Sequence, residues 1–278
     1  MTNWERVVAL ARVAFGEGLM EEEALCQAVF LIPKGKGEYH GIGLVEVIWE
    51  AVLEILNLRL TASITYHDFL HLFWAGHGTG TATLEAKLLQ QLASLRKEVL
   101  YVISMDLHNS YDALDRFRCL EILEGYGVGP RAFQILRTYW RWLRMVAKAG
   151  GYYGSVFQGS RGVTQGDPLS PTIFNVVADA LVRHWVAVMV ERADERSRHR
   201  QEGIHQNSLF YADYGIVASP DLIWLQGAFS TLLGLFDKVG LKTNTGKTAG
   251  MVCCPFQAAG TQSESAYRRR MIGEGTSY

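Results

Sequence analysis

A short apolar run that ends at a carboxylate constrains the fold of this chain more than any other feature. Residues 99–103 (VLYVI) are mostly β-branched or aromatic, which is typical of a buried strand, and Asp106 follows at its end. Residues 207–218 predict two short strands around an Asp-Tyr-Gly turn, in which Gly215 supplies the positive φ. A second carboxylate, Asp213, therefore stands at the tip of a hairpin.

Helical patterns alternate with these strands. Residues 44–60 carry apolar side chains at three- and four-residue spacing, which predicts an amphipathic helix. Its expected buried stripe is Leu44, Val47, Ile48, Ala51, Val52, Ile55 and Leu58. Further helices are expected at 84–97, 115–125, 130–147, 170–190 and 221–239. The long helix 170–190 should bury Phe174, Val177, Leu181, Trp185 and Val188.

Turn and helix-end residues delimit these segments. Pro130 favours the first turn of a helix, Ser170-Pro171 is expected to cap the next, and Gly240 to end the last one. Strands or an extended loop are expected at 150–168, and a strand pair at 241–253. The charged stretch 191–206 favours an exposed connection, and the polar residues after Pro255 a disordered tail. The pattern indicates one α/β or α+β unit.

Composition narrows the class of protein. The chain has 27 Lys and Arg against 28 Asp and Glu, so it lacks the basic excess of most duplex-binding domains. Basic residues do cluster locally, in 34–36, 137–148 and 268–270. Four unevenly spaced cysteines favour reduced thiols in a soluble, intracellular protein, cytoplasmic or nuclear, rather than a zinc site. We expect no signal segment and no apolar run long enough to cross a membrane, and find no glycine-rich nucleotide loop.

The two carboxylates suggest chemistry if the fold brings them together. Asp106 and Asp213 at neighbouring strand ends would repel each other without a cation, and paired Mg²⁺ ions would relieve that repulsion. An Asp after a strand is also a common cap or turn residue, so spacing alone leaves both readings open.

A resemblance to a known family bears on this choice. The segments MDLHNSYDALD, GVTQGDPLSPTIFNVVADAL, FYADYG and GLKTNTGKT occur in the order of the palm motifs of reverse transcriptases. Upstream, LIPKGKGEYHGIGL and FWAGHGTGTATLEA resemble fingers motifs of the group II intron and non-LTR retroelement branch. These matches cover about residues 30–252. The resemblance implies an α+β right-hand polymerase fold with an antiparallel palm sheet packed on helices.

The resemblance also implies domain boundaries. Fingers are expected mainly in 1–98 and about 116–160, and palm in about 99–115 and 161–255. Residues 256–278 would form the tail. Because the motif-D-like segment lies close to the end of the chain, we expect no thumb.

Residue roles follow from matching positions. Asp106 and Asp213 would be catalytic metal ligands, with help from the Leu107 carbonyl, and Lys247 resembles the lysine that protonates leaving pyrophosphate. Tyr111 matches the aromatic gate against a ribose 2′-hydroxyl. Gln165 and Gly166 would lie against the nascent base pair and template, and Lys34 and Lys36 would hold the triphosphate. A buried aromatic, a polar turn and solvated lysines are the alternatives for these residues.

Departures from the family pattern fall on functional positions. Tyr214 stands where the hairpin usually carries a second Asp, and a protonated phenol is a poor Mg²⁺ ligand. His40, Trp74 and His77 stand where relatives commonly have Arg, so phosphate clamping is weakened.

The resulting hypothesis is a reverse-transcriptase-like domain. It would copy an RNA template from a DNA primer with dNTPs and two Mg²⁺ ions, with reduced or lost activity and no membrane partner. The alternatives are a non-catalytic nucleic-acid-binding remnant of a retroelement polymerase, or a structural domain that no longer binds nucleic acid.

Overall fold

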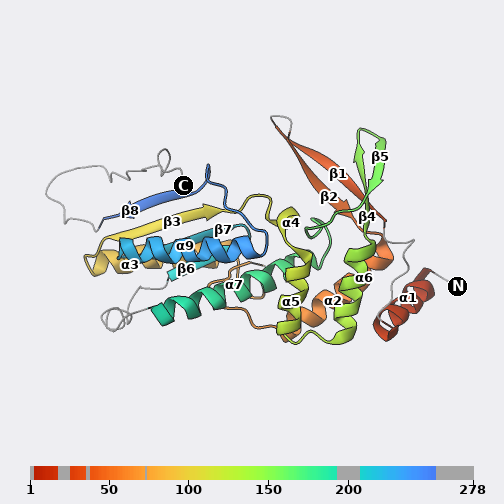
Figure 1. The fold of residues 1–278 in the computed structure, drawn as a ribbon, viewed down its shortest axis with the longest axis horizontal. Helices are drawn as coiled ribbons and strands as arrows, with labels where there is room; N and C mark the ends of the chain where they lie inside the picture. The colour runs from red at the N-terminus through yellow and green to blue at the C-terminus, as the bar shows by residue number, and fades with distance from the viewer. Residues whose placement is uncertain (1–2, 18–25, 36–37, 73, 193–206, 255–278) are drawn as a thin grey trace. The chain divides into compact units, whose positions relative to one another are not determined.

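The computed structural model describes residues 3–17, 26–35, 38–72, 74–192 and 207–254 of the 278-residue chain (Figure 1). The chain forms two compact units, and each unit is assembled from two separate stretches. The first comprises Met1–Thr65 and Tyr111–Val177, and the second Tyr66–Ser110 and Ala178–Tyr278. Each unit contains one four-stranded sheet.

The sheet of the first unit has the strand order β2-β1-β4-β5. Its strands are β1 (Cys26–Gly35), β2 (Glu38–Leu44), β4 (Arg144–Ala149) and β5 (Tyr152–Phe157). β1 pairs antiparallel with β2 and parallel with β4, and β5 closes a hairpin with β4. The helices of this unit are α1 (Asn3–Glu17), α2 (Val47–Ser63), α4 (Ser110–Ala113), α5 (Arg116–Gly125) and α6 (Pro130–Trp142). One hydrogen bond, from Gln27 Nε2 to Tyr139 Oη (3.0 Å), ties the sheet to α6.

The first unit differs from the sequence-based expectations in three ways. The β1–β2 hairpin had no predicted counterpart, and the helix predicted to reach residue 147 ends at Trp142 because β4 begins at Arg144. Helix α2 exists, but Leu44 of its predicted buried stripe lies in β2, and Val47 and Leu58 are 73% and 60% exposed. The residues that α2 buries are Trp49, Val52, Leu53, Leu56 and Leu60. Apolar side chains surround most of this helix, so three- and four-residue spacing fits more than one face.

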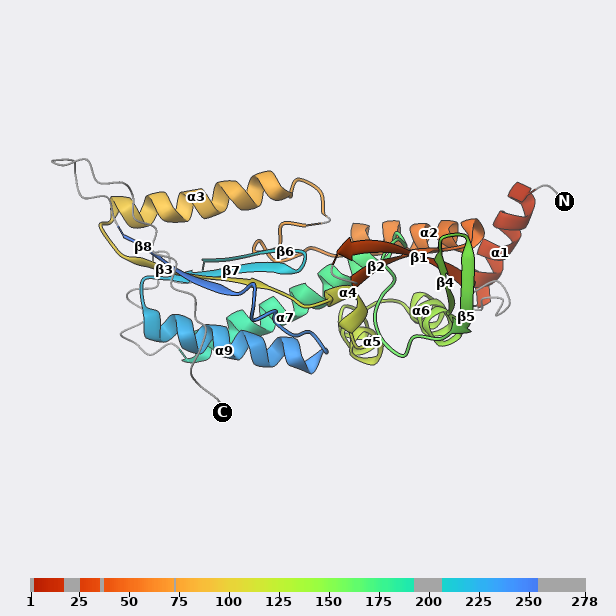
Figure 2. The ribbon, with the colours of Figure 1, turned by 90° about the horizontal axis from the view of Figure 1, so that it is seen from above.

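The sheet of the second unit is antiparallel, with the order β6-β7-β3-β8. Its strands are β3 (Leu100–Asp106), β6 (Asn207–Tyr211), β7 (Tyr214–Ser219) and β8 (Ala249–Cys253). Figure 2 shows α3 (Thr79–Leu95) on one face of this sheet and α9 (Leu222–Lys238) on the other. Under α3, a small core joins Leu89 and Ala93 to Leu100 and Ala218 of the sheet.

Two predictions in the second unit need correction. The hairpin turn consists of Ala212 and Asp213, and Ala212 has the positive φ (53°), whereas Gly215 lies within β7. A Cβ on Gly215 would come within 2.8 Å of Phe210 Cδ1, so packing rather than φ requires glycine there. Between residues 241 and 253, β8 is a single strand and not half of a strand pair. The predicted end of α9 is confirmed, with Gly240 at φ 84° after Val239.

Helix α7 (Ser170–Arg192) includes residues from both units. Phe174, Val177, Leu181 and Trp185 are buried as predicted. The capping side chain is Asp167 rather than Ser170, because its Oδ1 accepts the backbone N–H groups of Leu169 (2.9 Å) and Ser170 (2.7 Å).

Contrary to the expectation from the sequence, one helix has the length and composition of a membrane-spanning segment. Residues Ser170–Glu191 have the length and the mean hydropathy (1.6) of a membrane span, yet 61% of that window is buried inside the protein. A core helix of a soluble protein has the same properties.

The predicted fingers and palm boundaries remain predictions. Helix α3, which falls inside the predicted fingers, packs on the second unit's sheet. The predicted tail 256–278 and most of the predicted connection 191–206 lie outside the described residues.

Candidate active site

Two neighbouring strands of the second unit carry the carboxylates. Asp106 ends β3 and is only 3% exposed, and its register partner across the sheet is Tyr214 at the start of β7. Asp213 precedes Tyr214 in the turn, and its carbonyl accepts the Leu107 N–H at 2.8 Å. The fold therefore brings Asp106, Leu107 and Asp213 to adjacent strand ends, as predicted from the sequence.

A turn after α9 adds the lysine. The Asn244 N–H donates to the Asp106 carbonyl (2.7 Å), and the Lys247 N–H donates to the Asn244 carbonyl (3.0 Å). This turn places Lys247 Nζ 3.1 Å from Asp106 Oδ2. The hydrogen bond and the charge of Asp106 raise the pKa of Lys247, and Tyr214 and Asp213 add to the rise. Lys247 therefore interacts with both carboxylates, by a direct contact with Asp106 and through the charge of Asp213.

The geometry leaves one carboxylate oxygen available. Asp106 Oδ1 is buried and has no hydrogen-bond partner among the described residues. A buried anionic oxygen without a donor is costly unless a cation contacts it, so Asp106 fits a divalent metal ion. Across the described parts of the chain, however, no three His, Cys, Asp or Glu side chains gather as a ready metal cluster.

Tyr214 faces Asp106 across the sheet. Directly opposed residues of an antiparallel pair project to the same face, so Tyr214 lies on the side of Asp106. Its side chain is 52% exposed. A phenol therefore lies where the family resemblance predicts a second carboxylate.

The first unit holds the predicted substrate-binding residues. Tyr111 lies in the one-turn helix α4 and stacks on Phe174, with 5.3 Å between ring centroids and 4° between planes. The Gln165 carbonyl accepts the Gly43 N–H at 2.7 Å, which fastens the Gln165-Gly166 turn to β2. Gly166 has φ 116°, and a Cβ there would lie 2.4 Å from the Gly43 carbonyl oxygen. Only glycine fits this turn.

The predicted triphosphate lysines are only partly placed. Lys34 is exposed on β1, and Lys36 lies outside the described residues. Partial burial raises the pKa of Asp112, and the nearby charges of His40 and Lys34 oppose this rise. Asp112, next to the predicted gate Tyr111, is a charged residue of this region that sequence reasoning missed. The Tyr111-Asp112 pair inside MDLHNSYDALD was the available signal.

Asp167 is a second missed residue. Burial raises the pKa of its carboxyl, although hydrogen bonds from Ser170 and Tyr139 oppose the rise. Ser170 Oγ lies 2.7 Å and Tyr139 Oη 3.4 Å from Asp167 Oδ2. Within the QGDPLSP motif, Asp167 therefore fixes the start of α7 directly after the Gln165-Gly166 turn.

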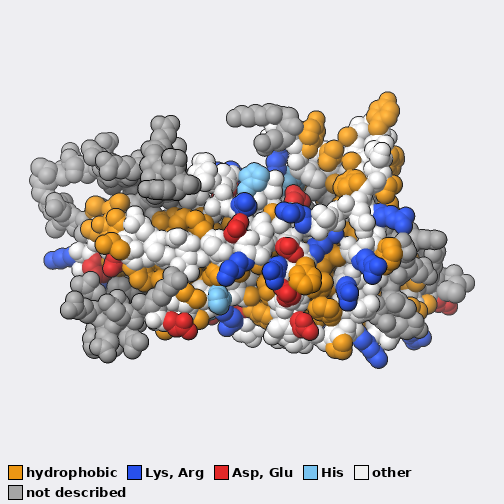
Figure 3. Space-filling model, in the orientation of Figure 1, with side chains coloured by type: hydrophobic (Ala, Val, Ile, Leu, Met, Phe, Trp, Pro, Cys, Tyr) orange, Lys and Arg blue, Asp and Glu red, His pale blue; other side chains and the backbone are white. Residues whose placement is uncertain are grey.

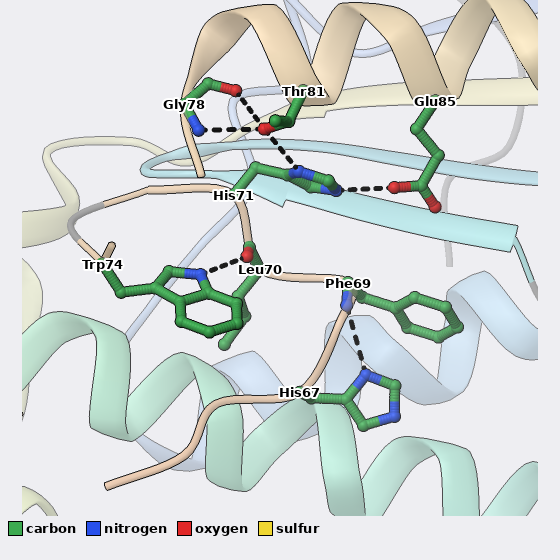
Figure 4. Close-up of polar contacts among 8 residues, drawn as sticks. All are labelled: His67, Phe69, Leu70, His71, Trp74, Gly78, Thr81 and Glu85. Carbon is green, nitrogen blue, oxygen red and sulfur yellow. Dashed lines mark hydrogen bonds and ion pairs between the residues drawn. The ribbon is translucent and has the colours of Figure 1, made fainter. Parts of the chain in front are cut away.

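Trp74 and His77, two of the three residues at positions where the resemblance predicts arginine, lie in the segment that joins α2 to α3 in the sequence. Figure 4 shows the Trp74 indole donating to the Leu70 carbonyl (2.6 Å) and His71 lying between Thr81 and Glu85. The ring of His77 stacks on Trp74, with centroids 3.6 Å apart. These positions provide aromatic surfaces instead of guanidinium groups.

The mixed helices and antiparallel sheets are those of a right-hand polymerase fold, and the strand-end carboxylates and the adjacent lysine lie at one of these sheets. The family model described as reverse transcriptase (RNA-dependent DNA polymerase) matches residues 32–269. The chain belongs to the reverse transcriptase family.

Two retrotransposon polyproteins are similar to this chain in sequence. The chain is 23% identical, over 222 residues, to the retrovirus-related Pol polyprotein from the type-2 retrotransposable element R2DM of Drosophila melanogaster. It is 26% identical over 122 residues to the Pol polyprotein from the type-1 retrotransposable element R2 of Nasonia vitripennis. The alignments cover 79% and 39% of this chain but only 20% and 10% of those proteins.

Solved structures show the same fold. A telomerase from Candida tropicalis, truncated from its C-terminal domain, aligns with a TM-score of 0.62 at 15% identity, over 93% of this chain and 56% of that one. A Candida albicans telomerase in complex with a fragment of telomeric RNA aligns with a TM-score of 0.57 at 15% identity, over 81% and 42%. The predicted α+β right-hand polymerase fold is confirmed.

Proposed function

We propose that this chain is the RNA-directed DNA polymerase domain of a retroelement protein, with a catalytic site that Tyr214 has weakened. The observation that carries the proposal is the meeting of Asp106, Asp213 and Lys247 at the strand ends of one sheet. Its substrates would be an RNA template, a DNA primer and dNTPs. Four free cysteines, two of them exposed, support action in a reducing compartment, the cytoplasm or nucleus.

Two Mg²⁺ ions would be held by the Asp106 and Asp213 carboxylates and the Leu107 carbonyl, and would activate the primer hydroxyl for in-line attack on a dNTP. The buried, unpartnered Asp106 Oδ1 supports this assignment. The raised pKa keeps Lys247 protonated beside Asp106, so it would supply positive charge to the leaving pyrophosphate and would give up its proton only as negative charge develops there. Tyr111, stacked on Phe174, would present a rigid ring to the sugar of the incoming nucleotide.

A second candidate function is nucleic-acid binding without synthesis. Tyr214 opposite Asp106 favours it, because one carboxylate fewer leaves the site short of anionic ligands. In that case nucleic-acid binding would persist while the chemistry would be lost.

Mg²⁺-dependent dTTP incorporation on poly(rA)–oligo(dT) separates the two candidates. We expect weak incorporation by the unmodified chain and none by Asp106→Ala. Tyr214→Asp should raise the rate at least about tenfold, comparable to the effect of restoring a supporting group at a metal site. No incorporation by either the unmodified chain or folded Tyr214→Asp would reject the polymerase and leave the binding function.

A further inference from the structure

Arg116 is a half-buried arginine at a position that is unfavourable for its own helix. It is the first residue of α5, and Asp115 caps that helix by accepting the N–H groups of Phe117 and Arg118. The positive end of the helix dipole repels a cation in the first turn. Burial lowers the pKa of Arg116, although a guanidinium stays protonated at neutral pH. The interactions that stabilise this charge therefore come from outside α5.

Backbone carbonyls of two other segments supply these interactions. Arg116 Nε donates to the Gly162 carbonyl (2.7 Å), and Nη1 donates to the carbonyls of Gly159 (2.6 Å) and Trp140 (3.1 Å). Trp140 belongs to the last turn of α6, where the carbonyls carry the negative end of that helix dipole. One side chain thereby joins the start of α5, the end of α6 and the loop 159–162.

The exposed charges of α5 behave differently. Figure 3 shows acidic and basic side chains next to one another over this helix. Arg118, two residues after Arg116, has a side chain that is 53% exposed and lies 2.6 Å from Glu121. Exposed pairs of this kind contribute little to stability. Arg118 is therefore a suitable control for Arg116, because both arginines lie in the first turn of the same helix.

The loop that Arg116 holds also contacts the predicted sugar gate. The Gly162 N–H donates to the Leu114 carbonyl (2.7 Å), and the Val163 N–H donates to the Tyr111 carbonyl (2.8 Å). Gly162 has φ 83°, and a Cβ there would lie 2.7 Å from the Asp112 carbonyl oxygen. The loop therefore packs directly on the backbone of residues 111–114.

Tyr111 is thus held at both ends. Its carbonyl is fixed by Val163 of the loop, and its ring is stacked on Phe174 of α7, with 5.3 Å between ring centroids. A shift of the loop would move the first of these contacts and not the second. The ring of Tyr111 would then tilt away from its stacked position.

We propose that Arg116 is a positioning residue that holds Tyr111 in place through the 159–163 loop, and thereby sets the preference for deoxyribonucleotides over ribonucleotides. The inference rests on the proposed polymerase function, because it concerns the sugar of the incoming nucleotide. An aromatic gate rejects a 2′-hydroxyl only if its ring stays in position, and a misplacement of about 1 Å can cost about a hundredfold in rate. Arg116 acts through the loop and does not touch the substrate.

Nucleotide selectivity tests the proposal. The measured quantity is the ratio of kcat/KM for dTTP to that for UTP on poly(rA)–oligo(dT), in the unmodified chain and in Tyr214→Asp. We expect Arg116→Met, which loses all three carbonyl contacts, to lower this ratio by about tenfold or more. Arg116→Lys keeps a cation and should lower it less, and Arg118→Met should leave it unchanged.

An arginine that only stabilises the fold would give a different result. Its loss would slow the incorporation of both nucleotides equally and leave the ratio unchanged, and this outcome would overturn the proposal. Thermal melting verifies that each variant is folded. Should Arg116→Met fail to fold, Arg116→Lys serves in its place.

A second measurement requires no synthesis. The chain is labelled with a fluorinated tyrosine, and the fluorine NMR signal of Tyr111 is assigned by its loss in Tyr111→Phe. We expect Arg116→Met to shift or broaden this signal and Arg118→Met to leave it as in the unmodified chain. An unchanged Tyr111 signal in folded Arg116→Met would overturn the proposal, whether or not the chain makes DNA.

The two measurements separate failure of this inference from failure of the polymerase. If no protein incorporates either nucleotide, the polymerase function is rejected, and a changed Tyr111 signal still supports the placement of Tyr111 by Arg116. If incorporation is observed and the ratio does not respond to Arg116→Met, the polymerase stands and the inference fails.

Discussion

At the scale of residues, Lys247 is the cation that Asp106 contacts in this structure. We predict that Lys247→Met lowers the melting temperature in EDTA, because it removes the partner of a buried carboxylate. Adding Mn²⁺ or Mg²⁺ should then raise the melting temperature of Lys247→Met more than that of the unmodified chain, because the lysine no longer competes for the carboxylate. Thermal unfolding with and without metal measures both effects.

Lys242→Met is the matched control for that experiment. Lys242 is an exposed lysine on the same connection, and its partner is the exposed Asp237, 3.8 Å away. Because surface ion pairs contribute little, its melting temperature and metal response should match those of the unmodified chain. A Lys247→Met variant with an unchanged metal response would contradict the view that lysine and metal share Asp106.

The cysteines give a second prediction at this scale. Burial raises the pKa of Cys119 to about 12, whereas Cys26 and Cys254 are exposed. Because the thiolate is the reactive form, a disulfide reagent such as DTNB should modify Cys26 and Cys254 in the folded chain and reach Cys119 only on unfolding. Peptide mass mapping assigns the sites. Early labelling of Cys119 would show that α5 opens in the native state.

The same thiol links pH to stability. The folded pKa of Cys119 lies above the usual 9.0, so the folded state binds more protons than the unfolded state between the two values. Its contribution to stability is complete below pH 9.0 and is lost as the pH rises toward 12. The unfolding midpoint in urea should therefore fall through this window, and less so for Cys119→Ala.

At the scale of elements, the Gln165-Gly166 turn should tolerate no side chain. In Gly166→Ala the methyl group would meet the Gly43 carbonyl at 2.4 Å while φ is 116°. We expect a loss of about 3 kcal/mol or more in the free energy of unfolding, from backbone strain together with steric overlap. Gly150→Ala is the control, with φ 54° and nothing within 4 Å, and should lose about 1 kcal/mol. Equal losses would show that the turn shifts away from β2.

Local sequence determined some elements and not others. The β-branched run before Asp106 and the capped helix α9 follow from short-range rules, so both were predictable. The chain from 144 to 147 continues a helical pattern but forms β4 because β1, over a hundred residues earlier, pairs with it. The turn at Ala212 was assigned to Gly215 because a glycine usually marks positive φ, whereas here Gly215 makes room for Phe210. Tertiary pairing and packing overrode local preference in both cases.

The candidate site likewise contains some features that the sequence predicted and others that it did not. The carboxylates could be predicted, because each one ends a recognisable strand. Contacts made by residues far apart in sequence could not, such as Lys247 on Asp106 or the Asp112 carboxyl beside Lys34 and His40. The sequence also gave no sign of the β2-β1-β4-β5 sheet, because β1 and β2 were not predicted as strands.

At the scale of the whole molecule, each unit interleaves two distant stretches of chain. β3, from the first of the second unit's stretches, lies between β7 and β8, which come more than a hundred residues later. β1 likewise needs β4 as a neighbour. Cutting the chain between residues 110 and 111 would therefore leave β1, β2 and β3 in one fragment and β4, β7 and β8 in the other.

We predict that fragments 1–110 and 111–278 do not fold separately, because unpaired central strands expose backbone groups and apolar faces that cannot be satisfied alone. Each fragment should unfold without a cooperative transition and be digested rapidly by protease. Mixing the two fragments should restore protection from protease if their contacts outweigh the additional entropy that two separate chains lose when they associate. A cooperative melt from 1–110 alone would mean that the β1–β2 hairpin and the helices around it form a stable core without β4. In that case the interleaving of the two units would be a consequence of connectivity rather than a requirement for folding.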